Sequence, residues 1–155
     1  MDENVPTGDF GTFYEASRGD AMALAWLLTR NSAACEDVVH DAYAAVLARF
    51  ESVDQPAAYL RTAIVNGVYS RERRAKRERA RMELVAVTAP SIVDGPTGGL
   101  ADAVAVLPIK PRTAVVLRYW AGLTDVEIAE AMSLRPGSVR SILSRALAQL
   151  RRDFK

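Results

Sequence analysis

The chain has 155 residues, half of them hydrophobic and a quarter charged, which indicates a packed core rather than wholesale disorder. Its single cysteine, Cys35, excludes an intrachain disulfide and fits a reducing cytoplasm. The acidic start is unlike a signal peptide, and no apolar run approaches the ~18–20 residues of a membrane span. We therefore expect a cytoplasmic protein without membrane insertion. Strand-like alternation is hard to find, and the helix-favouring residues Ala, Arg and Leu are abundant, which predicts an all-α fold.

The net charge of +1 hides a strongly uneven distribution. Residues 1–54 carry ten acidic and three basic side chains, a net charge of −7. Residues 71–81 carry seven basic and two acidic side chains, and residues 135–155 carry six basic and one acidic, so each segment has a net charge of +5. One basic run alone would fit a solvated helix face equally well. Because basic segments attract phosphates and acidic surfaces avoid them, the asymmetry indicates two kinds of partner.

Three helices are predicted in the first half of the chain. The first extends from about Asp9 to Thr29, where apolar residues recur at three- and four-residue spacing. The second begins after an N-cap at Asn31 or Ser32 and ends near Phe50. A short loop, Glu51–Gln55, leads to a third helix that starts at Pro56, with Asp54 or Gln55 as its cap.

The second predicted helix has two contrasting faces. Its buried stripe is predicted to consist of Val39, Ala42, Tyr43, Val46, Leu47 and Phe50. The opposite face carries Asp37, His40 and Asp41. This face is too polar for a core, so it is either a binding surface or simply solvated.

The domain boundary is predicted after the third helix. That helix turns an apolar face inward and then enters the basic segment 71–81; the inward residues are Tyr59, Leu60, Ala63, Ile64 and Val68. From about residue 81 to residue 99 the periodicity fails, and glycines and prolines mark turns. We therefore predict a first helical domain at residues 1–80, a flexible linker at 81–99 and a second helical domain at 100–155.

The second domain is predicted to contain four short helices, Leu100–Leu107, Lys110–Trp120, Thr124–Met132 and Pro136–Phe154. Thr124 and Glu127 have the spacing of a capping box, and a short turn then separates the last two helices, which is typical of a helix-turn-helix. The last helix begins with small residues and arginines that suit a major groove: Arg135, Gly137, Ser138, Arg140, Ser141, Ser144 and Arg145. An ordinary helical hairpin with a basic surface is the alternative.

Residues 100–153 closely resemble region 4 of extracytoplasmic-function sigma factors of the sigma-70 family. The matching pieces are Leu107-Pro108, Arg118-Tyr119, Gly122-Leu123-Thr124, Glu127-Ile128-Ala129 and Pro136-Gly137-Ser138-Val139. Several response-regulator output domains share this region. The first half resembles region 2 of the same family, through the acidic run Glu36–Tyr43 and through Ala58–Arg61, Val65-Asn66 and Arg73-Arg74. The resemblance extends from about Phe10 to Asp153.

The resemblance implies a sigma factor, which directs core RNA polymerase to specific promoters and assists their melting. The implied partners are the polymerase β′ coiled-coil and β flap, promoter DNA, and an anti-sigma protein that holds the sigma factor inactive. No catalysis, cofactor or metal is implied, because the polymerase supplies the chemistry. The resemblance assigns core-polymerase binding to Asp37, His40 and Asp41.

The resemblance also assigns two DNA surfaces. The non-template strand of the minus-ten element, with a base flipped out of the stack, would be held by Asp54, Arg61, Thr62, Asn66, Arg73 and Arg74. The duplex minus-thirty-five element would be read by the seven residues Arg135, Gly137, Ser138, Arg140, Ser141, Ser144 and Arg145. Four places depart from the usual pattern: Gly67 replaces a larger side chain, Ile142 replaces a frequent Arg, Tyr59 replaces a frequent Trp, and Met132-Ser133 replaces a Leu-Gly-like turn.

Two other classes of function compete with this interpretation. A helix-turn-helix regulator that acts without core polymerase would share the last helices, but it would not need the acidic helix coupled to Asn66. An enzyme is disfavoured because the chain has one histidine, one cysteine and no glycine-rich phosphate loop. His40 beside Asp37 and Asp41 could be read as a metal site, although a single histidine on a solvated helix is more often simply polar.

Overall fold

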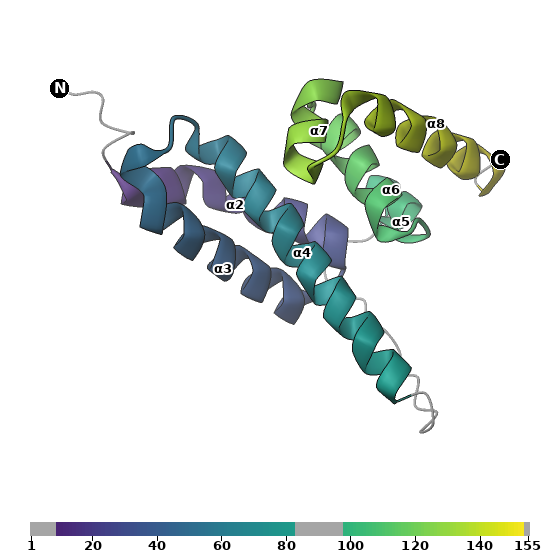
Figure 1. The fold of residues 1–155 in the computed structure, drawn as a ribbon, viewed down its shortest axis with the longest axis horizontal. Coiled ribbons are helices and arrows are strands. Elements are labelled where there is room, and N and C mark those ends of the chain that lie inside the picture. The colour runs from purple at the N-terminus through teal and green to yellow at the C-terminus, as the bar shows by residue number, and fades with distance from the viewer. Residues whose placement is uncertain (1–8, 83–97, 154–155) are drawn as a thin grey trace.

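The structure is a computed structural model that describes residues 9–82 and 98–153. Every regular element in these ranges is a helix, which confirms the all-α prediction. Figure 1 shows two helical groups side by side, the first formed by α2, α3 and α4 and the second by α5, α6, α7 and α8. Most of the predicted linker, residues 83–97, lies outside the described residues, as do residues 1–8 and 154–155.

The first group contains α2 (Phe10–Thr29), α3 (Ser32–Arg49) and α4 (Pro56–Arg81), with the single turn η1 (Phe50–Ser52) between α3 and α4. Asn31 caps α3, because its Oδ1 accepts a hydrogen bond from the amide of Ala34 at 2.9 Å. Gln55 occupies the N-cap position of α4, but no side chain there bonds to the helix. Gln55, one of the two predicted caps, is therefore the N-cap residue, and Pro56 suits the first turn of the helix.

The core of the first group follows the predicted apolar stripes with one correction. Leu47 was expected inside, but its side chain is 57% exposed. Val46 and Phe50 lie four residues apart and share the buried face, whereas Leu47 lies about 100° further round the helix than Val46. At the N-terminal end of α3 the buried face continues through Cys35 and Val38, which are each 2% exposed and were not predicted.

Gly67 allows a close approach of α4 to α3. A Cβ atom at Gly67 would lie 3.2 Å from Cγ1 of Val38, a distance that forces the valine to shift. Val38 is buried and β-branched, so it has few alternative rotamers. The departure of Gly67 from the usual sigma pattern thus has a packing reason, because Val38 fills the space that a larger side chain would take.

The second group contains α5 (Gly99–Ala105), α6 (Ile109–Val115), α7 (Asp125–Met132) and α8 (Pro136–Asp153). A π-helical turn, η3 (Val116–Trp120), continues α6, so the predicted helix at 110–120 is present with a widened last turn. The predicted capping box is confirmed: the amide of Thr124 donates to Glu127 Oε1 at 2.9 Å, and the amide of Glu127 donates to Thr124 Oγ1 at 3.2 Å. Ser133 adopts the left-handed conformation (φ 58°) in the turn between α7 and α8.

Two arginines, one from each group, donate hydrogen bonds to backbone carbonyl oxygens of the other group. Arg30, at the C-terminal end of α2, donates to the carbonyl oxygen of Ala101 and pairs with Asp102 Oδ1 at 3.2 Å. Arg112 of α6 donates from Nη1 to the carbonyl oxygen of Leu28 at 2.6 Å. The helices α4 and α7 also pack against each other. The two groups therefore share an interface that includes the part of α4 next to α7.

Candidate nucleic-acid and partner-binding surfaces

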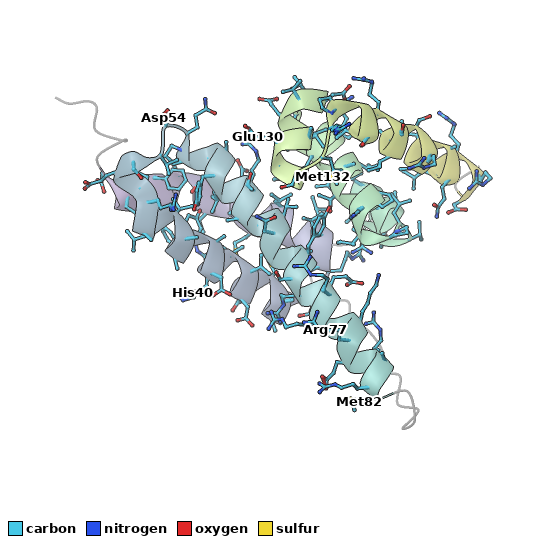
Figure 2. All side chains as sticks on the ribbon, in the orientation of Figure 1. His40, Asp54, Arg77, Met82, Glu130 and Met132 are labelled. Atoms are coloured by element: carbon cyan, nitrogen blue, oxygen red, sulfur yellow. The ribbon has the colours of Figure 1, made fainter. Side chains whose placement is uncertain are left out.

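The polar face of α3 is exposed over its whole length. Asp37, His40 and Asp41 all point to solvent, opposite the buried face of the helix. Figure 2 shows His40 on the side of α3 that faces away from α4. Asp37 Oδ2 lies 3.4 Å from Nη1 of Arg71, so the basic segment of α4 begins beside the acidic face. This surface can offer carboxylates to a basic partner without disturbing the core.

A groove between α3 and α4 brings two predicted binding surfaces together. It has a volume of about 460 Å³, and its polar lining residues are Asp41, Tyr59, Thr62 and Asn66. Small residues form much of the rest of its lining, namely Ala42, Ala45, Ala63 and Gly67. Asp54 is exposed in the loop before α4. The groove is thus a place where a planar group bound to Asn66 could be held against the helix pair.

The six residues predicted for the minus-ten element do not form one cluster. Thr62, Asn66 and Arg73 are spaced by four and seven residues, so they lie along one stripe of α4. Arg74 lies on another side of the helix, where it lines a cavity with Asn31 and Arg112. Figure 1 shows that the C-terminal end of α4 extends beyond α2 and α3, and most of its basic side chains are exposed.

Arg61 faces away from the groove, toward the second group of helices. It lines a cavity of about 370 Å³ together with residues of α2 and with Trp120. Hydrogen bonds with Thr124 hold the pKa of Glu127 below its usual value, and the positive charge of Arg61 adds to this effect. Arg61 is therefore half-buried where α4 meets α7, and Figure 2 labels Glu130 of α7 on the side toward α4.

The predicted minus-thirty-five residues form one exposed face on the N-terminal part of α8. All seven, Arg135, Gly137, Ser138, Arg140, Ser141, Ser144 and Arg145, are exposed. The opposite face of α8 packs through Val139, Leu143 and Ala146, which are buried. Ile142 is half-buried and lines a cavity with Pro108 and Pro111, so this position is turned partly toward α6 rather than fully toward solvent.

Sequence reasoning missed an ion-pair network behind this face. Asp125, the first residue of α7, pairs through Oδ1 with Nη2 of Arg118 and through Oδ2 with Nη1 of Arg140 at 3.6 Å. Arg118 also donates from Nε to the carbonyl oxygen of Leu123 at 3.0 Å. No sequence signal links these residues, because the contacts depend on how η3, α7 and α8 pack against one another.

Other kinds of site find no support in the described part of the chain. No group of His, Cys, Asp and Glu that could hold a metal ion is found among residues 9–82 and 98–153, so His40 has no ligand cluster there. Over the same residues, no helix has the length and apolarity needed to span a bilayer. Burial raises the pKa of Cys35 to about 11, so its thiol stays protonated near neutral pH.

Each of the two helical groups matches a known protein family. Residues 13–78 match the family description "Sigma-70 region 2", and residues 98–150 match "Sigma-70, region 4". An RNA polymerase sigma-E factor from Streptomyces coelicolor is 31% identical over 151 residues, covering 91% of this chain and 84% of that protein. A sigma-E factor from Streptomyces antibioticus is 45% identical over 56 residues, which cover 36% of this chain and 31% of that protein.

Two solved structures have the same fold. The sigma factor RpoE in complex with the anti-sigma factor NepR, from Bartonella quintana, superimposes with a TM-score of 0.77 at 24% identity, covering 93% of this chain and 95% of that one. CnrH in complex with the cytosolic domain of CnrY superimposes with a TM-score of 0.63 at 24% identity, covering 91% and 84%. Since both sigma-70 regions are matched in order and the Streptomyces coelicolor relative aligns with nearly the whole chain, this chain belongs to the sigma-70 family of RNA polymerase sigma factors.

Proposed function

We propose that this sigma factor directs core RNA polymerase to promoters by dividing the task among three surfaces. The observation that carries the proposal is the separation of charge by helix. The polar face of α3 exposes carboxylates, whereas the C-terminal half of α4 and the N-terminal half of α8 expose arginines. An acidic surface is repelled by DNA phosphates and a basic one is attracted, so one protein can hold the polymerase and the promoter at the same time.

The acidic face of α3 is the proposed contact with the β′ coiled-coil of the polymerase. Asp37, His40 and Asp41 are exposed and lie within about one helical turn of each other. The second helical group is the proposed contact with the β flap. We assign residues 1–80 to a first domain, which contains the acidic face of α3, and residues 100–155 to a second domain, which would contact the β flap. Residues 81–99 form the proposed linker between the two domains.

The stripe of α4 that carries Thr62, Asn66 and Arg73 is the proposed site for the non-template strand of the minus-ten element. An asparagine amide can both donate and accept hydrogen bonds, so Asn66 can read a base edge without carrying charge. The groove beside it supports the capture of an unstacked base. Asp54, Arg61 and Arg74 complete the proposed set, with Arg74 serving the backbone phosphates.

The exposed face of α8 is the proposed reader of the minus-thirty-five element. Its buried side anchors the helix to α6 and α7, which leaves Arg135, Arg140 and Arg145 exposed on the side that would enter a major groove. Gly137, Ser138, Ser141 and Ser144 are small, so the helix can approach the base edges closely.

The proposed function also covers where the chain acts, which protein supplies the catalysis and which kind of protein regulates it. The polymerase would supply all catalysis in the cytoplasm, and this chain would supply none. An anti-sigma protein is the proposed regulator, because the two similar solved structures are complexes with such partners, NepR in one case and the cytosolic domain of CnrY in the other.

Run-off transcription with purified core polymerase and a pool of promoters tests the proposed function. We expect discrete transcripts only when the chain and the core polymerase are both present, and all selected promoters should share two sequence elements. A protein that binds these duplexes tightly without core polymerase, and yields no transcripts with it, would instead be a helix-turn-helix regulator.

A further inference from the structure

The carboxylate of Asp125 bridges two arginines from different elements. One oxygen, Oδ1, pairs with Arg118 of η3, and the other, Oδ2, lies 3.6 Å from Nη1 of Arg140 on α8. Asp125 is held in turn by its place in the first turn of α7, directly after the capping residue Thr124. A single carboxylate therefore connects the end of α6, the start of α7 and the surface of α8.

The three side chains of this network differ in how exposed they are to solvent. The side chains of Arg118 and Asp125 are 31% and 27% exposed, and that of Arg140 is 65% exposed. Arg118 is fixed further by its hydrogen bond to the carbonyl oxygen of Leu123. Asp125 is thus anchored on its inner side, and its outer oxygen meets an arginine on the exposed face of α8.

We propose that Asp125 is a positioning residue that fixes the guanidinium group of Arg140 for base-edge readout of the minus-thirty-five element. The inference rests on the proposed function of α8. Arginine has five N–H donors, and the ion pair with Asp125 at 3.6 Å leaves them available for the O6 and N7 atoms of a guanine. A side chain already held in one orientation loses less conformational freedom when it binds.

Arg140 differs in this respect from its neighbours on the same face. Between described residues, no ion pair involves Arg135 or Arg145. The Arg140 guanidinium also lies beside Gly137, one turn earlier on α8, where a Cβ atom would be in ordinary van der Waals contact with its Nη2 at 3.7 Å. Arg140 is therefore the one arginine of the three whose direction the surrounding structure specifies, and Arg145 is a matched comparison on the same helix.

A carboxylate beside a DNA-binding face also repels phosphates. Asp125→Asn removes this repulsion while keeping an oxygen that can accept from Arg118. If Asp125 positions Arg140, the substitution should therefore lower sequence discrimination without lowering non-specific affinity. Simple damage to the fold would lower both, so the two effects can be separated.

The test uses holoenzyme assembled from core polymerase and the full chain, with competition binding to a set of promoters that carry every single-base change in the minus-thirty-five element. We expect Asp125→Asn to reduce discrimination about 5- to 10-fold at the base pair that Arg140→Ala also affects, and to leave other positions unchanged. Adding Asp125→Asn to Arg140→Ala should cause no further loss, whereas it should add to the effect of Arg145→Ala. Asp125→Glu, which keeps the charge, should restore part of the discrimination.

Three results would overturn the inference while leaving the proposed function intact. These are unchanged discrimination in Asp125→Asn, a full additional loss on top of Arg140→Ala, and equal weakening on every promoter variant. The last result would make Asp125 a purely structural residue. A wild-type holoenzyme without any preference at the minus-thirty-five element would overturn the proposed role of α8 itself, and the inference with it. Thermal melting of each variant, with Asp125→Glu as the second test of position 125, identifies any loss of folding.

Discussion

Arg112 donates a hydrogen bond to the carbonyl oxygen of Leu28 at 2.6 Å, and so connects α6 to the C-terminal end of α2. Arg112 is half-buried, and this burial lowers the pKa of its guanidinium because the charged form is less stable away from water. Arg30 makes the reciprocal contact with the carbonyl oxygen of Ala101. The two arginines thus join the two helical groups from both sides of their interface.

The Arg112→Ala variant should therefore favour separation of the two helical groups. The substitution leaves a carbonyl oxygen of the interface without its donor, at a cost of about 1–3 kcal/mol. Fluorescence energy transfer between dyes on Arg77→Cys and Arg152→Cys reports the distance, because native Cys35 is 2% exposed and stays unlabelled. We expect a longer mean distance in Arg112→Ala and an unchanged one in Arg49→Ala, an exposed arginine on α3. Identical distances in all three proteins would contradict the role of Arg112.

Charge reversal on α3 should weaken polymerase binding without unfolding the protein. In Asp37→Lys/Asp41→Lys the only recorded ion pair lost between described residues is the exposed contact with Arg71, which contributes at most about 1 kcal/mol. The helical circular-dichroism signal should persist, and core affinity should fall at least 10-fold. The variant Glu15→Lys/Asp20→Lys makes the same change in net charge on α2 and serves as the control. Equal affinities of both variants for core polymerase would assign the docking surface elsewhere.

Because Gly67 packs against Val38, we expect Gly67→Ala to destabilise the wild-type protein but to stabilise a Val38→Ala variant. Gly67→Ala should gain roughly 0.5–1 kcal/mol of helix propensity but lose about 1–3 kcal/mol to overpacking, because the new Cβ would lie 3.2 Å from Val38. The free energy of unfolding should therefore decrease in the wild-type background. In a Val38→Ala background the same substitution should increase it. Urea unfolding of the four proteins measures both effects, and a gain in both backgrounds would show that Val38 yields freely.

The thiol of Cys35 should be inert in the folded protein. It is buried, donates to the carbonyl oxygen of Met22 at 3.3 Å, and has a pKa raised to about 11. A raised folded-state pKa favours the protonated form, so its contribution to stability is complete below the unfolded pKa of about 8.5 and is lost as pH rises toward 11. We expect slow reaction with Ellman's reagent at pH 8 and rapid reaction in urea. Rapid labelling of the native protein would place Cys35 at the surface.

Local signals predicted the elements well, because they depend on neighbours in sequence. The capping box of Thr124 and Glu127 needs only three residues of spacing, and both of its hydrogen bonds are present. The residues predicted for the stripe of α3 are buried except Leu47, an apolar residue beside the core face, and the buried Cys35 and Val38 were missed. A hydrophobic side chain one position out of phase cannot be distinguished by composition alone.

Contacts between distant elements could not be predicted in this way. Arg112 and Leu28 are 84 residues apart, and the bond forms only because α6 lies against the end of α2. Arg61 illustrates the consequence for the candidate site. The family pattern groups it with Asn66, yet the turn of the helix directs Arg61 toward α7 and Asn66 toward the groove beside α3.

We propose that this chain opens promoters through α4, where Asn66 is exposed and lines the groove beside α3. Permanganate footprinting of thymines in the minus-ten region measures this directly. With core polymerase and the wild-type chain, we predict reactive thymines on duplex promoter DNA. Asn66→Ala should keep its core affinity but lose most of that reactivity, and a pre-melted bubble should restore part of the transcription because the cost of unpairing is already met. Wild-type thymine reactivity in Asn66→Ala on duplex DNA would contradict the claim.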